Sequence, residues 1–196
     1  MRLFLSLLTL FVGFAGTVTA QETIEPAPAD KAVVYLARPS TLGVLINFNF
    51  YDGDQLIGRF NGGKYLRYEC APGEHVFWAR SENRSFVEAT LEAGNIYVIE
   101  AIPLMGGIKA QVLLAPVDPT KDEVSKATRK LLTGEASQQF SPEQLAEWAD
   151  KTDGKTQNGL AQYQQKAEKD RKIAQLTPAM AVSPTALVWE KKSKTK

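Results

Sequence analysis

A series of short apolar segments between residues 31 and 117, separated by turn-forming residues, constrains the fold of this chain most strongly. In one segment Val44, Ile46 and Phe48 recur at every second position, the period of a strand with one buried face. Turns such as Asp52-Gly53 end the segments. About seven or eight strands at intervals of roughly 8–12 residues predict an antiparallel β-sandwich. Because no stretch between them is long enough for a crossover helix, we do not expect parallel pairing.

The hydrophobic period changes to that of a helix after Pro116. Residues 119–132 are predicted to form a helix capped by Asp118 or Thr120. Residues 155–176 are predicted to form another, with a weak apolar stripe. The predicted fold class is therefore mainly β with C-terminal α: a sandwich over residues 31–117 followed by two or three helices in an extension over residues 118–176.

The best-marked helix covers residues 141–151. Ser141 is the expected N-cap, Pro142 occupies the first helical position, and Gln144 completes a capping box. Phe140 and Leu145 are spaced for a hydrophobic staple across the start of this helix.

The first twenty residues have the pattern of a secretory signal peptide. Arg2 precedes an apolar run, and the small residues Val18-Thr19-Ala20 follow it. The run is short for a membrane span, which needs about 20 residues, so cleavage after Ala20 is predicted; an uncleaved anchor is the alternative. No Cys follows the run for lipid attachment. We expect a periplasmic or secreted protein with a flexible leader over residues 21–30 and a Lys-rich tail over residues 177–196.

The net charge and the counts of His and Cys argue against two kinds of binding partner, nucleic acid and zinc. The chain has 23 Lys plus Arg and 22 Asp plus Glu, and losing Arg2 with the signal peptide makes the mature chain formally neutral. Nucleic acid is therefore not an expected partner. One His and one Cys cannot build a His/Cys zinc site, and we expect no cofactor. The Lys tail could make a weak contact with an anionic envelope surface.

Several short motifs in residues 31–102 carry a resemblance to a known family. They are Ala32-Val33-Val34-Tyr35, Arg38-Pro39-Ser40, Tyr51-Asp52-Gly53, Gly58, Asn61-Gly62-Gly63-Lys64-Tyr65, Pro72-Gly73-Glu74-His75 and Glu92-Ala93-Gly94-Asn95-Ile96-Tyr97. This region resembles the bacterial domain-of-unknown-function family 2846, exported β-domains of envelope proteins. The resemblance implies a carboxypeptidase-regulatory-like or PEGA-like sandwich and no catalytic residues. Many members look like lipoproteins, whereas this chain lacks the acylated Cys.

Six residues form the candidate binding face. Tyrosine offers contact area and a polar tip, which suits carbohydrate and protein surfaces, although strand propensity and core packing also explain tyrosines here. Arg38 could hold an anion or a carboxylate, or pair with a nearby acid. The lone histidine could act as a base or ligand, or bond a turn carbonyl at the start of its strand. The candidates are Tyr35, Arg38, Tyr51, Tyr65, Tyr68 and His75.

Two further features have a functional and a structural interpretation. Cys70 could form an intermolecular disulfide or be a small buried side chain. Asp52-Gly53-Asp54 begins like a calcium loop, but apolar residues follow instead of further oxygen ligands, which favours a hairpin turn.

These observations predict an exported, non-catalytic envelope protein that acts as a binding or scaffolding module. Its contact surface would be a sheet edge or the helical extension, and the partner an envelope protein or a small ligand. The alternative is a small-ligand or glycan carrier with a tyrosine-lined concave face. A hydrolase is the least favoured hypothesis, because no nucleophile motif such as Gly-x-Ser-x-Gly is present.

Overall fold

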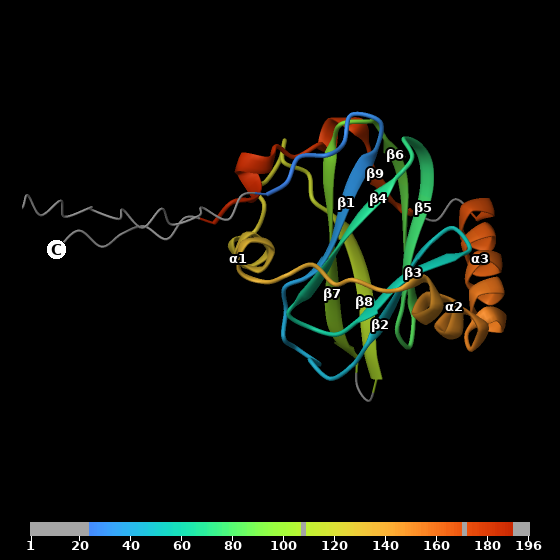
Figure 1. The fold of residues 1–196 in the computed structure, drawn as a ribbon. Helices are drawn as coiled ribbons and strands as arrows, with labels where there is room; N and C mark the ends of the chain where they lie inside the picture. Colours follow the sequence, from blue (N-terminus) through green and yellow to red (C-terminus); the bar gives the residue numbers. More distant parts are fainter. Residues whose placement is uncertain (1–23, 107–108, 170–171, 190–196) are drawn as a thin grey trace, which may run out of the picture.

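The computed structural model describes residues 24–106, 109–169 and 172–189, and the expected signal peptide and final lysines lie outside them. Two β-sheets pack face to face (Figure 1). Sheet A has the strand order β4-β1-β7-β8 and sheet B the order β3-β2-β5-β6-β9. The strands are β1 (Ala32–Arg38), β2 (Phe48–Asp52), β3 (Gln55–Phe60), β4 (Lys64–Cys70), β5 (Gly73–Arg80), β6 (Arg84–Leu91), β7 (Ile96–Gly106), β8 (Lys109–Pro116) and β9 (Ala174–Leu176).

The expected mainly β sandwich with C-terminal helices is confirmed, but the expectation that pairing would be antiparallel throughout is wrong. β1 pairs in parallel with β7, and β6 pairs in parallel with β9. Sequence reasoning considered only connections between successive strands. Here the chain forms β2 to β6 between β1 and β7. These five strands make up the long connection that a parallel pair of strands requires.

The main core lies between the two sheets. Alternate side chains of the strands meet there, as the period of two predicts. Phe48, Phe50 and Phe77 are fully buried in it, and Phe50 stacks on Phe60 with ring centroids 4.3 Å apart.

The outer face of sheet A is covered as well, so β1 is buried on both sides. Helix α1 (Lys126–Gly134) packs there with Leu131 and Leu132, beside the 3₁₀ turn η2 (Pro184–Leu187). Ile24 and Ala27, both from the expected flexible leader, pack in this cluster. Val182 and Leu187, from the described part of the expected tail, are buried in the same cluster.

The outer face of sheet B is covered by α2 (Pro142–Asp150) and α3 (Asp153–Glu168) (Figure 1). Under them Tyr51 stacks on Trp78 at 3.8 Å between ring centroids. Trp148 of α2 and Tyr163 of α3 pack on this aromatic cluster. The helical extension therefore divides between the two outer faces, with α1 on one and α2 and α3 on the other.

The helix predictions are right in number and differ at their ends. The capping box of Ser141 and Gln144 is present. The first helix starts at Lys126 with Ser125 as N-cap, because Asp118 instead accepts from the Thr120 amide within a turn. The third ends at Glu168, and β9 follows it. Phe140 lies over Gly58 and makes its ring contact with Trp148.

The described chain has no helix of the length and apolarity needed to cross a membrane.

Candidate functional site

The structure separates the predicted site residues instead of gathering them on one face. Tyr35 and Tyr65 meet on the outer side of sheet A, with ring centroids 5.9 Å apart. Tyr51 is buried under the helices on the outer side of sheet B. Tyr68 and His75 meet at a third place, beside Asp52. The tyrosine-lined exposed face expected for a carrier is therefore not formed, because strand alternation and helix packing bury most of these rings.

Arg38 is fully buried and binds main-chain carbonyls. Its guanidinium donates to the carbonyl of Ile46, to that of Gly43 at 2.9 Å and to that of Leu42 at 3.2 Å. It lies 3.8 Å above the Phe48 ring. Burial lowers the pKa of Arg38 to about 10, so it stays charged at neutral pH. Arg38 thereby holds the turn over residues 42–45. The strand that the alternation predicts from Val44 therefore begins only at Phe48, as β2.

His75, Asp52 and Tyr68 form a closed hydrogen-bonded cluster. His75 Nδ1 lies 2.8 Å from Asp52 Oδ2, and Nε2 lies 2.9 Å from the Ala71 carbonyl oxygen. The Tyr68 hydroxyl donates to the same Asp52 oxygen at 3.2 Å. The hydrogen bond to Asp52, and then the interaction with Cys70, raise the pKa of His75 to about 10.

This pKa decides what the only histidine can do. With an acceptor at each ring nitrogen, the imidazolium form satisfies both contacts and the neutral form satisfies one. At neutral pH His75 therefore holds two protons and has no free nitrogen lone pair for general-base work. Burial, and then the Asp52 carboxylate, raise the pKa of Tyr68, so its phenol also stays protonated.

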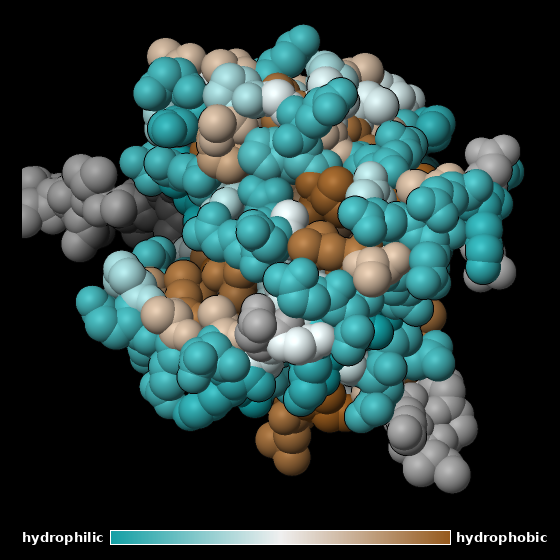
Figure 2. Space-filling model, turned by 90° about the vertical axis from the view of Figure 1, so that its right-hand side faces the viewer, coloured by the Kyte–Doolittle hydropathy of each residue, from teal (hydrophilic) through white to brown (hydrophobic). Residues whose placement is uncertain are grey.

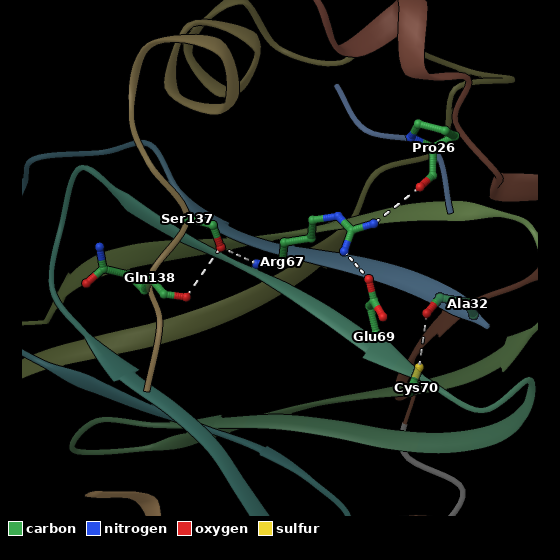
Figure 3. Close-up of polar contacts among 7 residues, drawn as sticks. All are labelled: Pro26, Ala32, Arg67, Glu69, Cys70, Ser137 and Gln138. Carbon is green, nitrogen blue, oxygen red and sulfur yellow. Dashed lines mark hydrogen bonds and ion pairs between the residues drawn. The ribbon is translucent and has the colours of Figure 1, made fainter. Parts of the chain in front are cut away.

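Cys70 lies beside this cluster and is buried. Its Sγ is 3.9 Å from the Ala32 carbonyl oxygen (Figure 3). The thiol faces the interior rather than solvent, which agrees with the interpretation of Cys70 as a small core residue and leaves it no access to a second chain.

A cavity of about 530 Å³ opens beside the cluster, at the edge where β2 turns into β3. Its walls come from β5, β6, α3 and β9. We call it the acidic pocket; its residues are Asp52, Gly53, Glu74, His75, Val76, Glu88, Ala89, Thr90, Tyr163 and Gln175.

Two carboxylates of the acidic pocket share one face of sheet B. Glu88 is opposite Val76, and Glu74 is opposite Thr90, so the two glutamates are diagonal neighbours on the outer face. Tyr163 Oη donates to Glu88 Oε1 at 2.9 Å, and Gln175 Nε2 donates to Glu88 Oε2 at 2.5 Å. These bonds fix Glu88 and leave room on its oxygens for another donor.

The acidic pocket contains three acids and one basic group. None of the residues that the structure describes around it is Lys or Arg. With Asp52 paired to His75, the charges of Glu74 and Glu88 remain for a ligand. This arrangement suits a cationic group that donates several hydrogen bonds.

A second cavity of about 490 Å³ lies against sheet A and includes Tyr35 and Tyr65. Its arginine is already engaged within the protein: Arg67 bonds Glu69 and donates to the Pro26 carbonyl at 3.2 Å (Figure 3). Ser137 Oγ accepts from the Arg67 amide at 2.9 Å. These contacts tie the N-terminal segment and the α1–α2 connection to β4, so we assign this cavity a structural role.

Of the polar residues of the acidic pocket, the sequence pointed to His75 as a candidate and to Asp52 as part of a turn, but not to Glu74, Glu88, Tyr163 or Gln175. Glu74 and Glu88 look like ordinary solvent-facing acids of alternating strands, and Tyr163 and Gln175 lie far away in sequence. Strand register and the packing of α3 bring the four together. Among the described residues no group of three or more His, Cys, Asp or Glu side chains is arranged to hold a metal ion.

No family model matches the chain, and no curated protein or solved structure gives a significant match. The resemblance to family 2846 therefore stays a prediction.

Proposed function

We propose that this protein is an exported, non-catalytic binding module of the cell envelope that takes a primary ammonium group in the acidic pocket. The observation that carries the proposal is the pair Glu74 and Glu88, diagonal on one sheet face in a cavity without Lys or Arg among its described lining residues. An ammonium donates three hydrogen bonds and neutralises carboxylate charge without needing a planar partner. The group could belong to a free amine or to a lysine of an envelope protein.

Two further observations support binding rather than catalysis at this place. The imidazolium of His75 is held at both nitrogens, and Cys70 is buried, so neither is available as base or nucleophile. The export part of the proposal is supported by the signal-peptide pattern of residues 1–20 and by the resemblance to family 2846.

A nuclear magnetic resonance titration with cadaverine tests the pocket. We expect shifts of the amides of residues 74–76 and 88–90, and a saturation curve that weakens with salt. The variant Glu88→Gln should bind at least about fivefold more weakly, because it removes one of the two charges. Glu123→Gln is the matched control, since Glu123 is an exposed acid outside the pocket lining, and it should leave binding unchanged.

A Lys-containing peptide in place of cadaverine separates the two sources of the ammonium group. Tighter binding of the peptide indicates a protein partner, and tighter binding of the diamine indicates a small ligand. Unshifted pocket amides with both probes would refute the ammonium site. Sequencing the N-terminus of protein from the periplasmic fraction tests export independently, with Gln21 expected as the first residue.

A further inference from the structure

The segment between β1 and β2 exposes four large aliphatic side chains. They stand in an uncharged stretch that runs from Pro39 to Tyr51. Hydrophobic side chains protrude from the lower end of the molecule in Figure 2, the end where Figure 1 places this segment. Contiguous exposed apolar side chains mark contact sites. The exposed fractions are 48% for Leu42, 42% for Val44, 86% for Leu45 and 39% for Ile46; we call these residues the apolar loop.

The apolar loop is held in its conformation by buried contacts. Arg38, with no exposed surface, donates to the carbonyls of Leu42, Gly43 and Ile46. The β3–β4 turn packs closely against the segment, because a Cβ on Gly62 would lie 2.6 Å from the Ser40 carbonyl oxygen. These contacts hold the loop backbone so that the aliphatic side chains point outward. Binding therefore loses little conformational entropy.

Satisfied carbonyls favour lipid over protein as the occupant of this surface. A protein partner can supply hydrogen bonds to a loop, whereas the acyl region of a bilayer cannot, so main-chain groups that enter it must be satisfied within the protein. Arg38 does this for three loop carbonyls. The loop also lacks Trp, Tyr and Arg, the residues that dominate protein–protein hot spots, and is built of aliphatic residues instead.

The distribution of charged residues along the strands also favours a lipid surface as the partner. Strand register places basic residues near the end that carries the loop: Lys64 is opposite the buried Arg38, and Arg80 is opposite Arg84. The exposed Glu82 lies in the turn between Arg80 and Arg84. Arg59 is opposite Asn49, one residue from the start of β2. Helix α2 carries three acids and packs near β3, where Arg59 lies 5.8 Å from the Trp148 ring of that helix. The far ends of the strands carry acids, namely Asp52, Glu69 and Glu74. Basic residues therefore outnumber acids on the strand ends and turns around the apolar loop, and acids gather at the far ends.

We propose that the apolar loop inserts into the interfacial region of an anionic phospholipid bilayer, with the basic strand ends facing the headgroups. Insertion removes aliphatic surface from water, and the basic residues add an attraction that falls with salt. The acidic pocket lies at the opposite end of the strands and would face away from the bilayer. This inference does not rest on ligand binding in that pocket.

Vesicle co-sedimentation tests the proposal. The wild type and every variant are purified from the native host, so that all have the same processed N-terminus. We expect the protein to sediment with vesicles of phosphatidylglycerol and phosphatidylethanolamine, and less with phosphatidylcholine alone. Leu45→Asp should lower the partition coefficient at least about tenfold, because a charge replaces the most exposed aliphatic residue. Leu113→Asp is the matched control, a 43% exposed leucine on β8, and should sediment like the wild type.

A second variant separates the electrostatic contribution. Lys64→Gln should weaken binding to the anionic vesicles and leave binding to phosphatidylcholine unchanged. Leu45 lies at the surface, so its variant should keep the wild-type urea midpoint. Three results would overturn the proposal: no sedimentation of the wild type, equal losses for the two leucine variants, or a concentration-dependent dimer in analytical ultracentrifugation that Leu45→Asp abolishes.

Discussion

The single histidine gives a direct test of the His75–Asp52 cluster. His75 has its pKa raised from 6.5 to about 10, with Nδ1 2.8 Å from Asp52 Oδ2 and 13% of each side chain exposed. Between these two pH values the folded chain keeps the proton that the unfolded chain has lost. The free energy of unfolding should therefore fall as pH rises across this window, by up to about 1.4 kcal/mol per pH unit.

The size of the effect follows from the shift. At 1.36 kcal/mol per pKa unit, the raised pKa of His75 corresponds to at most about 4–5 kcal/mol of the free energy of unfolding. Solvent screening of the partly exposed His75–Asp52 pair lowers the expected contribution to about 2–3 kcal/mol. This stability is fully present below pH 6.5 and is lost as pH passes about 10. His75→Gln should thus be destabilised in urea at pH 6 and should match the wild type above pH 10.

Two measurements check this. Because the chain has one His, its imidazole resonances are unambiguous in a nuclear magnetic resonance titration, and their midpoint should lie near pH 10. Asp52→Asn should move the midpoint towards 6.5. A wild-type midpoint near 6.5, or a stability difference between wild type and His75→Gln that stays constant with pH, would refute the ion-pair explanation.

Three more predictions concern packing. Arg38→Met should cost about 2–4 kcal/mol in urea unfolding, because three loop carbonyls lose their donor; an unchanged midpoint would contradict the anchoring role. Gly159→Ala should destabilise by about 1–3 kcal/mol, because the new Cβ would meet Trp78 Cη2 at 2.5 Å. Gly154→Ala in the same helix meets nothing within 4 Å and should stabilise by up to about 1 kcal/mol; equal effects would show that α3 does not press on Trp78. Cys70 should react with a thiol reagent at the rate of unfolding, since it is buried; fast labelling of the native protein would contradict that placement.

Local patterns predicted much of the architecture. The period of two in the strands and the turn at Asp52-Gly53 depend on neighbouring residues, so they can be seen in the sequence. The capping box at Ser141 is equally local and is present in the structure. The ends of α1 were less predictable, because Asp118 and Ser125 are both competent caps and the chain uses the second.

Tertiary structure decided what the residues do. The parallel pairing of β1 with β7 joins segments about sixty residues apart, and no local pattern records such a partner. The tyrosines look like a binding face in sequence, but packing of helices on both outer faces buries most of them. Glu74 and Glu88 look like solvated residues, yet strand register and the position of α3, which brings Tyr163, gather them in one pocket. Residue type and spacing thus determined strands, turns and caps, whereas long-range pairing determined which side chains meet, because burial and charge depend on neighbours that are distant in the chain.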